Sequence, residues 1–156
     1  MKKLNKISDH VSMNEATYSY TAKKRGIYNG FSTEEHLDDA IRLAEEVFEP
    51  LRKEVGGPIK ISSFYRSPEL NKAIRGSKNS QHCKGQAMDI DDTYGYATNK
   101  EMFDFIKDNL SFDQLIWEYG DDNNPDWVHV SFNKEGNRGI VLRCTRRSGS
   151  PYYTNY

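Results

Sequence analysis

Apolar side chains recur at helical spacing from residue 32 to 57, and this pattern predicts the longest helix of the chain. Ser32, with Glu35 three positions later, has the pattern of a capping box, and a glycine pair beginning at Gly56 ends the helix. Shorter helical patterns cover residues 67–76 and 98–110. The apolar face of the long helix consists of Leu37, Ile41, Ala44, Phe48, Leu51 and Val55.

Several short runs alternate between apolar and polar residues and are rich in β-branched or aromatic side chains, so they predict strands. They are residues 58–66, 86–91, 112–120, 126–132 and 139–144. Helices followed by strands joined through short loops favour an α+β fold, with a mainly antiparallel sheet and helices packed on one of its faces.

At 156 residues the chain fits one domain with one core. We therefore expect a single domain over residues 1–156. Within it, residues 1–30 are expected to form an extended lead-in segment and residues 148–156 a loosely held tail.

Charge and composition narrow the class of protein. The 22 basic and 23 acidic residues nearly balance, so the chain lacks the electrostatic footprint of a nucleic-acid binder. Arg143, Arg146 and Arg147 form the only basic cluster, which we interpret as a solvated face.

No segment has the apolar length of a signal peptide or membrane span, so we expect cytoplasmic synthesis and no membrane partner. Cys83 and Cys144 are expected to be free thiols.

Residues 80–90, SQHCKGQAMDI, place two potential metal ligands seven positions apart, His82 and Asp89. Catalytic zinc takes three protein ligands from His, Cys, Asp or Glu and leaves a fourth position for water. Gly85 lets the backbone turn back, and Ala87 lets the following strand pass close to its neighbours, so that both ligands can face one point. His129, within a strand pattern, can supply the third ligand, although a lone histidine on a strand is more often structural.

The joint pattern carries a family resemblance. S-x-H-x-x-G-x-A-x-D, beginning at Ser80, and D-W-x-H, beginning at Asp126, resemble motifs of the zinc D-Ala-D-Ala metallopeptidases. This group includes D,D-carboxypeptidases, D,D-dipeptidases and the L-alanyl-D-glutamate endopeptidases of phage lysis, and it shares a fold with hedgehog domains. The resemblance implies a single Zn²⁺ held by His82, Asp89 and His129.

The resemblance also implies roles for residues around the metal. Asp126 takes the place of the general base, and Arg66 stabilises the oxyanion because its guanidinium stays charged. Ser80 and Trp127 are candidates for contact with substrate. Alternatives remain for each: Asp126 as a turn residue, Arg66 in a surface ion pair, Ser80 shaping the loop, and Trp127 in the core. Glu118, on a predicted strand, competes with Asp126 for the role of base.

The resemblance to this family implies a zinc peptidase that hydrolyses amide bonds next to D-amino acids in the peptide stems of peptidoglycan. We expect a monomer that acts as a phage-type lysin or related cell-wall hydrolase, reaching the wall after release or as a virion component. Two other functions stay open: a metal-containing binding module of the same fold without turnover, and a metal hydrolase acting on another amide.

Overall fold

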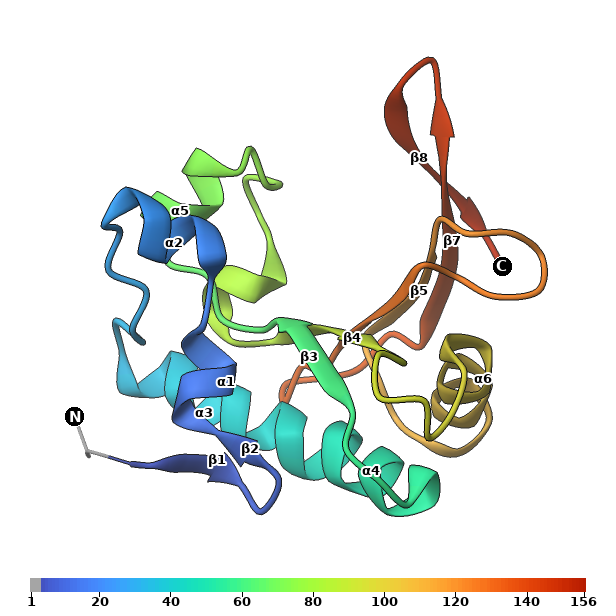
Figure 1. Cartoon of the computed structure of the whole chain (residues 1–156), viewed down its shortest axis with the longest axis horizontal. Coiled ribbons are helices and arrows are strands. Elements are labelled where there is room, and N and C mark those ends of the chain that lie inside the picture. Colours follow the sequence, from blue (N-terminus) through green and yellow to red (C-terminus); the bar gives the residue numbers. More distant parts are fainter. Residues whose placement is uncertain (1–3) are drawn as a thin grey trace.

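The computed structural model describes residues 4–156 as an α+β arrangement of helices with a six-stranded and a two-stranded sheet (Figure 1). The helices are α1 (Met13–Thr17), α2 (Tyr20–Arg25), α3 (Glu34–Leu43), α4 (Glu49–Val55), α5 (Pro68–Ala73) and α6 (Asn99–Asn109), with a π-helical turn η1 (Ala44–Phe48) and a 3-10 turn η2 (Gln81–Lys84). The strands are β1 (Lys6–Ser8), β2 (Val11–Ser12), β3 (Lys60–Ser63), β4 (Ala87–Asp91), β5 (Gln114–Glu118), β6 (Trp127–Ser131), β7 (Ile140–Arg147) and β8 (Ser150–Asn155).

The larger sheet has the strand order β3-β4-β6-β5-β7-β8. Its pairings are antiparallel except for β5 with β7, which run parallel because the chain crosses from β6 past β5 before it enters β7. The predicted α+β class with a mainly antiparallel sheet is therefore confirmed, and the parallel pair makes the sheet a mixed one.

The long helical pattern folds as α3, η1 and α4 in direct succession. The helix starts one residue later than the sequence predicts, because the Thr33 side chain, and not that of Ser32, accepts the capping hydrogen bond from the His36 amide. The π-helical turn lies just before Pro50, which has no amide proton to continue the regular hydrogen-bond ladder. Gly56 ends α4 in the left-handed conformation at φ 75°.

One face of the central strands builds the core. Met88 and Ile90 of β4 and Val128 and Val130 of β6 are fully buried and share one hydrophobic cluster with residues of α3, α4 and α6. In Figure 1 these helices lie below and beside the sheet. Because side chains alternate along a strand, the residues between these apolar positions, Asp89 among them, point to the opposite face. That face carries the candidate site.

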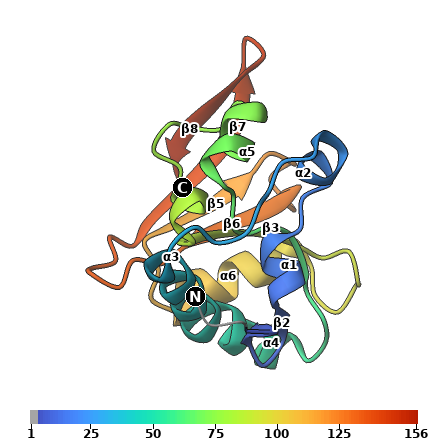
Figure 2. The same cartoon turned by 90° about the vertical axis from the view of Figure 1, so that its left-hand side faces the viewer.

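The amino-terminal segment was expected to be an extended lead-in, and this is wrong for its described part. Residues 4–30 include β1, β2, α1 and α2, and they pack beside β3 and α5 (Figure 2). Asn29 fixes the segment in place: its side-chain amide donates to the carbonyl oxygens of Thr17 and Tyr65, and its Oδ1 accepts from the Ser67 amide. A buried amide with three partners ties this segment to the strand that leads to Arg66.

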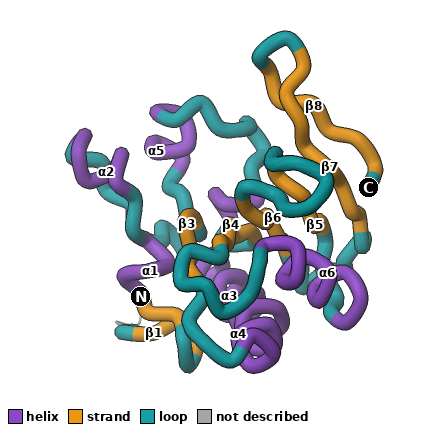
Figure 3. Tube along the Cα trace, turned by 45° about the vertical axis from the view of Figure 1, so that its right-hand side comes forward, coloured by secondary structure: helices purple, strands orange, loops and turns teal. Residues whose placement is uncertain are grey.

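The carboxyl-terminal segment was expected to be loosely held, which is also wrong. β8 pairs with residues 142–147 of β7 and forms a hairpin that extends past the other strands (Figure 3). Ser148 and Gly149 both have positive φ, as a tight hairpin turn requires. Tyr156 anchors the end, since its ring centroid lies 4.9 Å from that of Phe103 on α6.

Within the described residues, both cysteines are free, as expected. None of the helices in residues 4–156 combines the length and apolar character that crossing a membrane requires. The basic cluster is mostly engaged at the surface: Arg143 pairs with Asp122 at 2.7 Å, and the guanidinium groups of Arg146 and Arg147 lie over tyrosine rings.

Candidate metal centre

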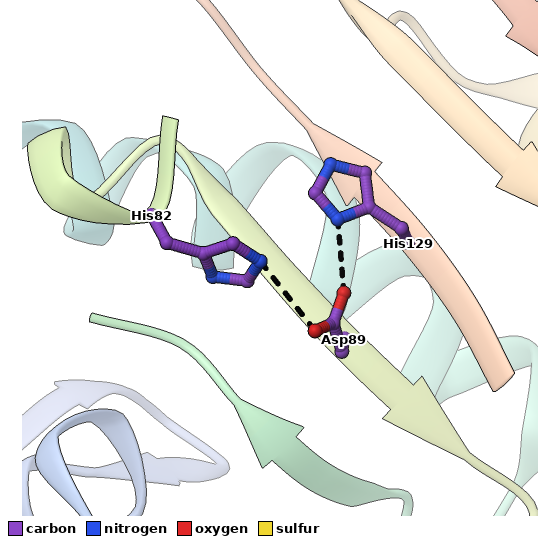
Figure 4. Close-up of side chains that lie close together, drawn as sticks. All are labelled: His82, Asp89 and His129. Atoms are coloured by element: carbon purple, nitrogen blue, oxygen red, sulfur yellow. Dashed lines mark hydrogen bonds and ion pairs between the residues drawn. The ribbon is translucent and has the colours of Figure 1, made fainter. Parts of the chain in front are cut away.

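The register of β4 and β6 brings two of the predicted ligands together. Asp89 and His129 are directly opposite each other in the antiparallel pair, so both side chains stand on the same face of the sheet. Nδ1 of His129 lies 2.9 Å from Oδ1 of Asp89 (Figure 4). One cross-strand pair thus brings together two residues that are forty positions apart in the sequence.

His82 approaches from outside the sheet, on the turn η2. The Ser80 hydroxyl accepts a hydrogen bond from the His82 amide at the start of this turn, which agrees with the loop-shaping interpretation of Ser80. Gly85 ends the turn at φ 72°, where a Cβ atom would come within 2.3 Å of the His36 carbonyl oxygen. The glycine is therefore required both for the backbone conformation and for the close approach to α3.

The orientation of the His82 ring is fixed by a backbone group. Nδ1 lies 2.7 Å from the carbonyl oxygen of Phe64, so this nitrogen carries the proton and donates it. The other nitrogen, Nε2, points toward Asp89, 3.5 Å from its Oδ2 (Figure 4). His82 is only 2% exposed, and within the described residues its Nε2 is a buried nitrogen without a hydrogen-bond partner.

These three residues fit a divalent metal. One ligand atom from each of His82, Asp89 and His129 lies within 4.8 Å of the others. Burial lowers the pKa of His82, which keeps the imidazole neutral and its Nε2 lone pair free. Burial alone would raise the pKa of Asp89, but the interactions with His82 and His129 outweigh it and hold the pKa well below its usual range. Two imidazole nitrogens and one carboxylate form a donor set that zinc accepts.

Glu118, the last residue of β5, lies on the face of the sheet that carries Asp89 and His129. It is opposite Trp127, two positions before His129, so its side chain stands on the face that carries Asp89 and His129. The residue is 7% exposed. Burial raises the pKa of Glu118 to about 7, with the charge of Asp89 adding to the shift and that of His129 opposing it. Such a carboxylate is suited to exchange protons near neutral pH.

Asp126 occupies a different environment. It is exposed to solvent and lies in a bend immediately before β6. Its amide donates to the Glu118 carbonyl oxygen at 2.8 Å, and its own carbonyl accepts from the side chain of Asn99. The backbone of Asp126 thus closes the end of the sheet, and the structure does not bring its carboxylate into the His82, Asp89 and His129 group.

Arg66 lies beside the three ligands. Its amide donates to the His82 carbonyl oxygen at 3.1 Å, and its NH1 group donates to Oδ1 of Asn71. Burial lowers the pKa of the Arg66 guanidinium, and the nearby Asp89 charge partly restores it. Nε is buried and has no hydrogen-bond partner within the described residues. A surface ion pair, the alternative for Arg66, does not occur among these residues.

Trp127 stands on the same face as His129 and is half-buried. Its ring packs against Tyr119, with the centroids 5.3 Å apart. Trp127 therefore borders the candidate centre and does not belong to the core, in contrast to Trp117, which is 1% exposed and packs in the hydrophobic cluster.

Sequence motifs could not place two groups at the candidate metal centre, the carbonyl of Phe64 and the carboxylate of Glu118. The Phe64 carbonyl that orients His82 is a backbone group, which leaves no residue-type signal. Glu118 sits in an ordinary strand pattern, and its place became visible only through the register of β5 with β6. The sequence did contain one indication: Glu118 is a charged residue next to a run of apolar residues that are buried. Charged residues are rarely buried unless they have a partner or a function.

The helices, the mixed sheet and the buried His/Asp/His group define an α+β protein with a candidate metal centre. Comparison with protein-family models gives a match to Peptidase M15 over residues 9–131, and the chain belongs to this family. A search of curated proteins finds no match. The family assignment confirms the resemblance to the zinc D-Ala-D-Ala metallopeptidases. It supports a metallopeptidase function acting on a peptide substrate, and the three converging side chains could hold the metal on which the family depends.

Proposed function

We propose that the protein is a zinc-dependent peptidase that hydrolyses amide bonds next to D-amino acids in peptidoglycan stem peptides, in the role of a phage-type lysin or a related cell-wall hydrolase. The observation that carries the proposal is the unpaired Nε2 of His82, buried and directed at Asp89 beside His129. A buried polar nitrogen without a partner is costly, and a bound cation would remove that cost.

His82, Asp89 and His129 would hold the ion. When bound, zinc supplies a Lewis acid that polarises the amide carbonyl and makes water in its open position more acidic. The Phe64 carbonyl keeps the Nδ1 proton of His82 in place, so that Nε2 remains available. The hydrogen bond to the Phe64 carbonyl thereby fixes both the tautomer and the orientation of the His82 ring.

We assign Glu118, in preference to Asp126, as the general base. Its carboxylate stands on the face of the ligands, and its raised pKa near 7 allows it to accept a proton from the attacking water and return it to the leaving amine. Arg66 offers a fixed positive charge and a free Nε donor next to Asp89, and we propose that it stabilises the negative charge that develops on the carbonyl oxygen. Trp127 would form one wall for the substrate.

The test is digestion of defined stem peptides with zinc content measured on the same preparations. Wild-type protein should bind one zinc and release cleavage products, and Asp89→Asn should lose both. Asp126→Asn, a matched change at an exposed carboxylate, should retain both. Cleavage that survives in Asp89→Asn or after chelation would contradict the proposal. Zinc retained by wild type without cleavage of any stem peptide would identify a binding module instead.

A further inference from the structure

Two glutamines bracket the η2 turn that carries His82. Gln81 is the first residue of the turn, and Gln86 lies between the end of the turn and β4, the strand of Asp89. The Gln86 amide donates to the Gln81 carbonyl oxygen at 2.9 Å, so the two residues close the base of the turn. Each glutamine side chain donates to a buried carboxylate, which in turn contacts a cation. We call these two sets of residues the glutamine bridges: Gln81–Asp113–Arg138 and Gln86–Asp39–Lys134.

The first glutamine bridge connects the turn to the segment before β5. Nε2 of Gln81 donates to Oδ2 of Asp113 at 3.0 Å, and Asp113 is only 2% exposed. Arg138 donates to both oxygens of the same carboxylate, from Nε at 3.0 Å and from Nη2 at 2.8 Å. These hydrogen bonds lower the pKa of Asp113, so it accepts from Gln81 as a charged group. A hydrogen bond to a charged acceptor is roughly twice as strong as one between neutral groups.

The second glutamine bridge has the same order of groups. Nε2 of Gln86 donates to Oδ2 of Asp39 on α3 at 2.9 Å, and Asp39 is 4% exposed. Nζ of Lys134 lies 3.1 Å from the other oxygen of this carboxylate. Both cations, Lys134 and Arg138, therefore come from the segment between β6 and β7. That segment also holds the backbone next to the turn, because the Phe132 amide donates to the Gln86 carbonyl oxygen at 2.9 Å.

The glutamine bridges restrain His82 without supplying a ligand atom. Neither glutamine belongs to the His82, Asp89 and His129 group, and both side chains donate to the buried carboxylates instead. A shift of the turn would break a hydrogen bond to a buried charge, which is costly for a carboxylate with little access to solvent. The Phe64 carbonyl fixes the direction of the His82 ring, whereas the bridges fix the place of the backbone that carries it.

We propose that Gln81 and Gln86 are positioning residues that set the affinity of the candidate centre for its metal. They hold the turn at the place where Nε2 of His82 faces Oδ2 of Asp89, 3.5 Å apart. A site whose donors already converge loses less conformational freedom when an ion binds. This inference rests on the proposed metal-dependent function. It adds that contacts outside the donor set, and not the ligands alone, determine how tightly the ion is held.

The experiment measures the zinc affinity of the folded, full-length protein by competition with a chromophoric chelator. Gln81→Met and Gln86→Met keep the length of the side chain and remove its donor. Each should weaken zinc binding by about tenfold, the lower end of the range of about 10- to 100-fold for groups that support metal ligands, and the double variant should weaken it further. Gln114→Met is the matched control. Gln114 lines the same cavity of about 450 Å³ as both glutamines but belongs to neither bridge, so its variant should keep the wild-type affinity.

The visible absorption spectrum of the Co²⁺-loaded protein separates positioning from a general loss of stability, because this spectrum reports the geometry of the ligands. It should change in the bridge variants and match wild type in Gln114→Met. Denaturant titrations of the metal-free proteins show how far each variant is destabilised. If the double methionine variant does not fold, Gln81→Asn/Gln86→Asn gives the same test, since it keeps both carboxamides but shortens each side chain by one methylene group.

Bridge variants that bind zinc like wild type and give its Co²⁺ spectrum, whatever their stability, would overturn the inference. An equal loss of zinc affinity in Gln114→Met would overturn it too, because any change in the cavity would then have the same effect. Wild-type protein that binds no zinc would refute the metal site and the peptidase proposal with it. A selective loss of affinity in the bridge variants, with a wild type that binds zinc but cleaves no stem peptide, would support the bridges and contradict only the peptidase proposal.

Discussion

The ends of β5 and β6 each carry a carboxylate, and the two occupy opposite environments although one backbone hydrogen bond joins them. Glu118, the last residue of β5, is buried on the face of the metal ligands. Asp126, one residue before β6, is exposed at the end of the sheet. The Asp126 amide donates to the Glu118 carbonyl oxygen, so the two backbones are neighbours although one side chain is exposed and the other is buried.

Strand register, and not distance along the sequence, places Glu118 on the face of the sheet that carries Asp89 and His129. Asp126 is only three residues from His129, yet it lies in a bend outside β6 and is exposed to solvent. Glu118 is eleven residues away, yet its pairing with Trp127 restores the same face. Three kinds of measurement can break or sharpen this contrast.

The largest effect is expected on the rate of hydrolysis. Glu118→Gln should lower kcat/KM for a stem peptide by about 100- to 10,000-fold, the usual contribution of a positioned general base. Asp126→Asn should stay within a few-fold of wild type, because its side chain is exposed to solvent in the bend before β6. Steady-state kinetics with zinc content matched between proteins gives the answer. The reverse ranking would return the role of base to Asp126.

A smaller effect is expected on stability when metal binds. Zinc at one hundred times its dissociation constant should raise the free energy of unfolding by about 2.7 kcal/mol. Wild type, Glu118→Gln and Asp126→Asn should all gain this stabilisation, since both carboxylates lie outside the ligand set. His129→Ala should not gain it, and denaturant titrations with and without zinc provide the measurement. If Glu118→Gln also failed to respond, Glu118 would be a ligand and not a base.

The sequence pointed to three side chains that the structure brings close together, His82, Asp89 and His129, because the constraints on the segment around the first two are local. His82, Gly85, Ala87 and Asp89 lie within one turn and one strand, where each small residue has a clear steric reason. The apolar periodicity of the long helix likewise reflects burial on one side. Whether the three converging residues bind zinc stays a prediction for the experiments above.

What the sequence could not supply depended on contacts between distant segments. The choice between Glu118 and Asp126 as general base depends on the register of β5 with β6. Alternation within either strand does not determine that register. The segments at the two ends looked unstructured because their order comes from partners elsewhere: Asn29 binds groups near Tyr65 and Ser67, and Tyr156 packs on Phe103. The residue pattern within a segment does not show which distant residues that segment will contact.

The smallest expected effect concerns the stability of the metal-free protein as a function of pH. The pKa of Glu118 is raised from 4.5 to about 7 in the folded state, so between these values the unfolded chain is ionised while the folded protein keeps the proton. The contribution of Glu118 to stability is therefore complete below pH 4.5 and is lost as the pH rises through 7. Glu118→Gln has no such titration, because its side chain is neutral throughout.

Glu118→Gln should thus unfold like wild type at pH 5 and be more stable by about 2 kcal/mol at pH 8.5, after discounting the full shift for partial solvation. Asp126→Asn should remain within about 0.5 kcal/mol of wild type at both values, as exposed substitutions usually do. Urea titrations of chelated protein at the two pH values provide the comparison. A stabilisation of Glu118→Gln that is equal at pH 5 and pH 8.5 would mean that the buried carboxylate does not hold its proton, and the contrast between the two acids would lose its electrostatic basis.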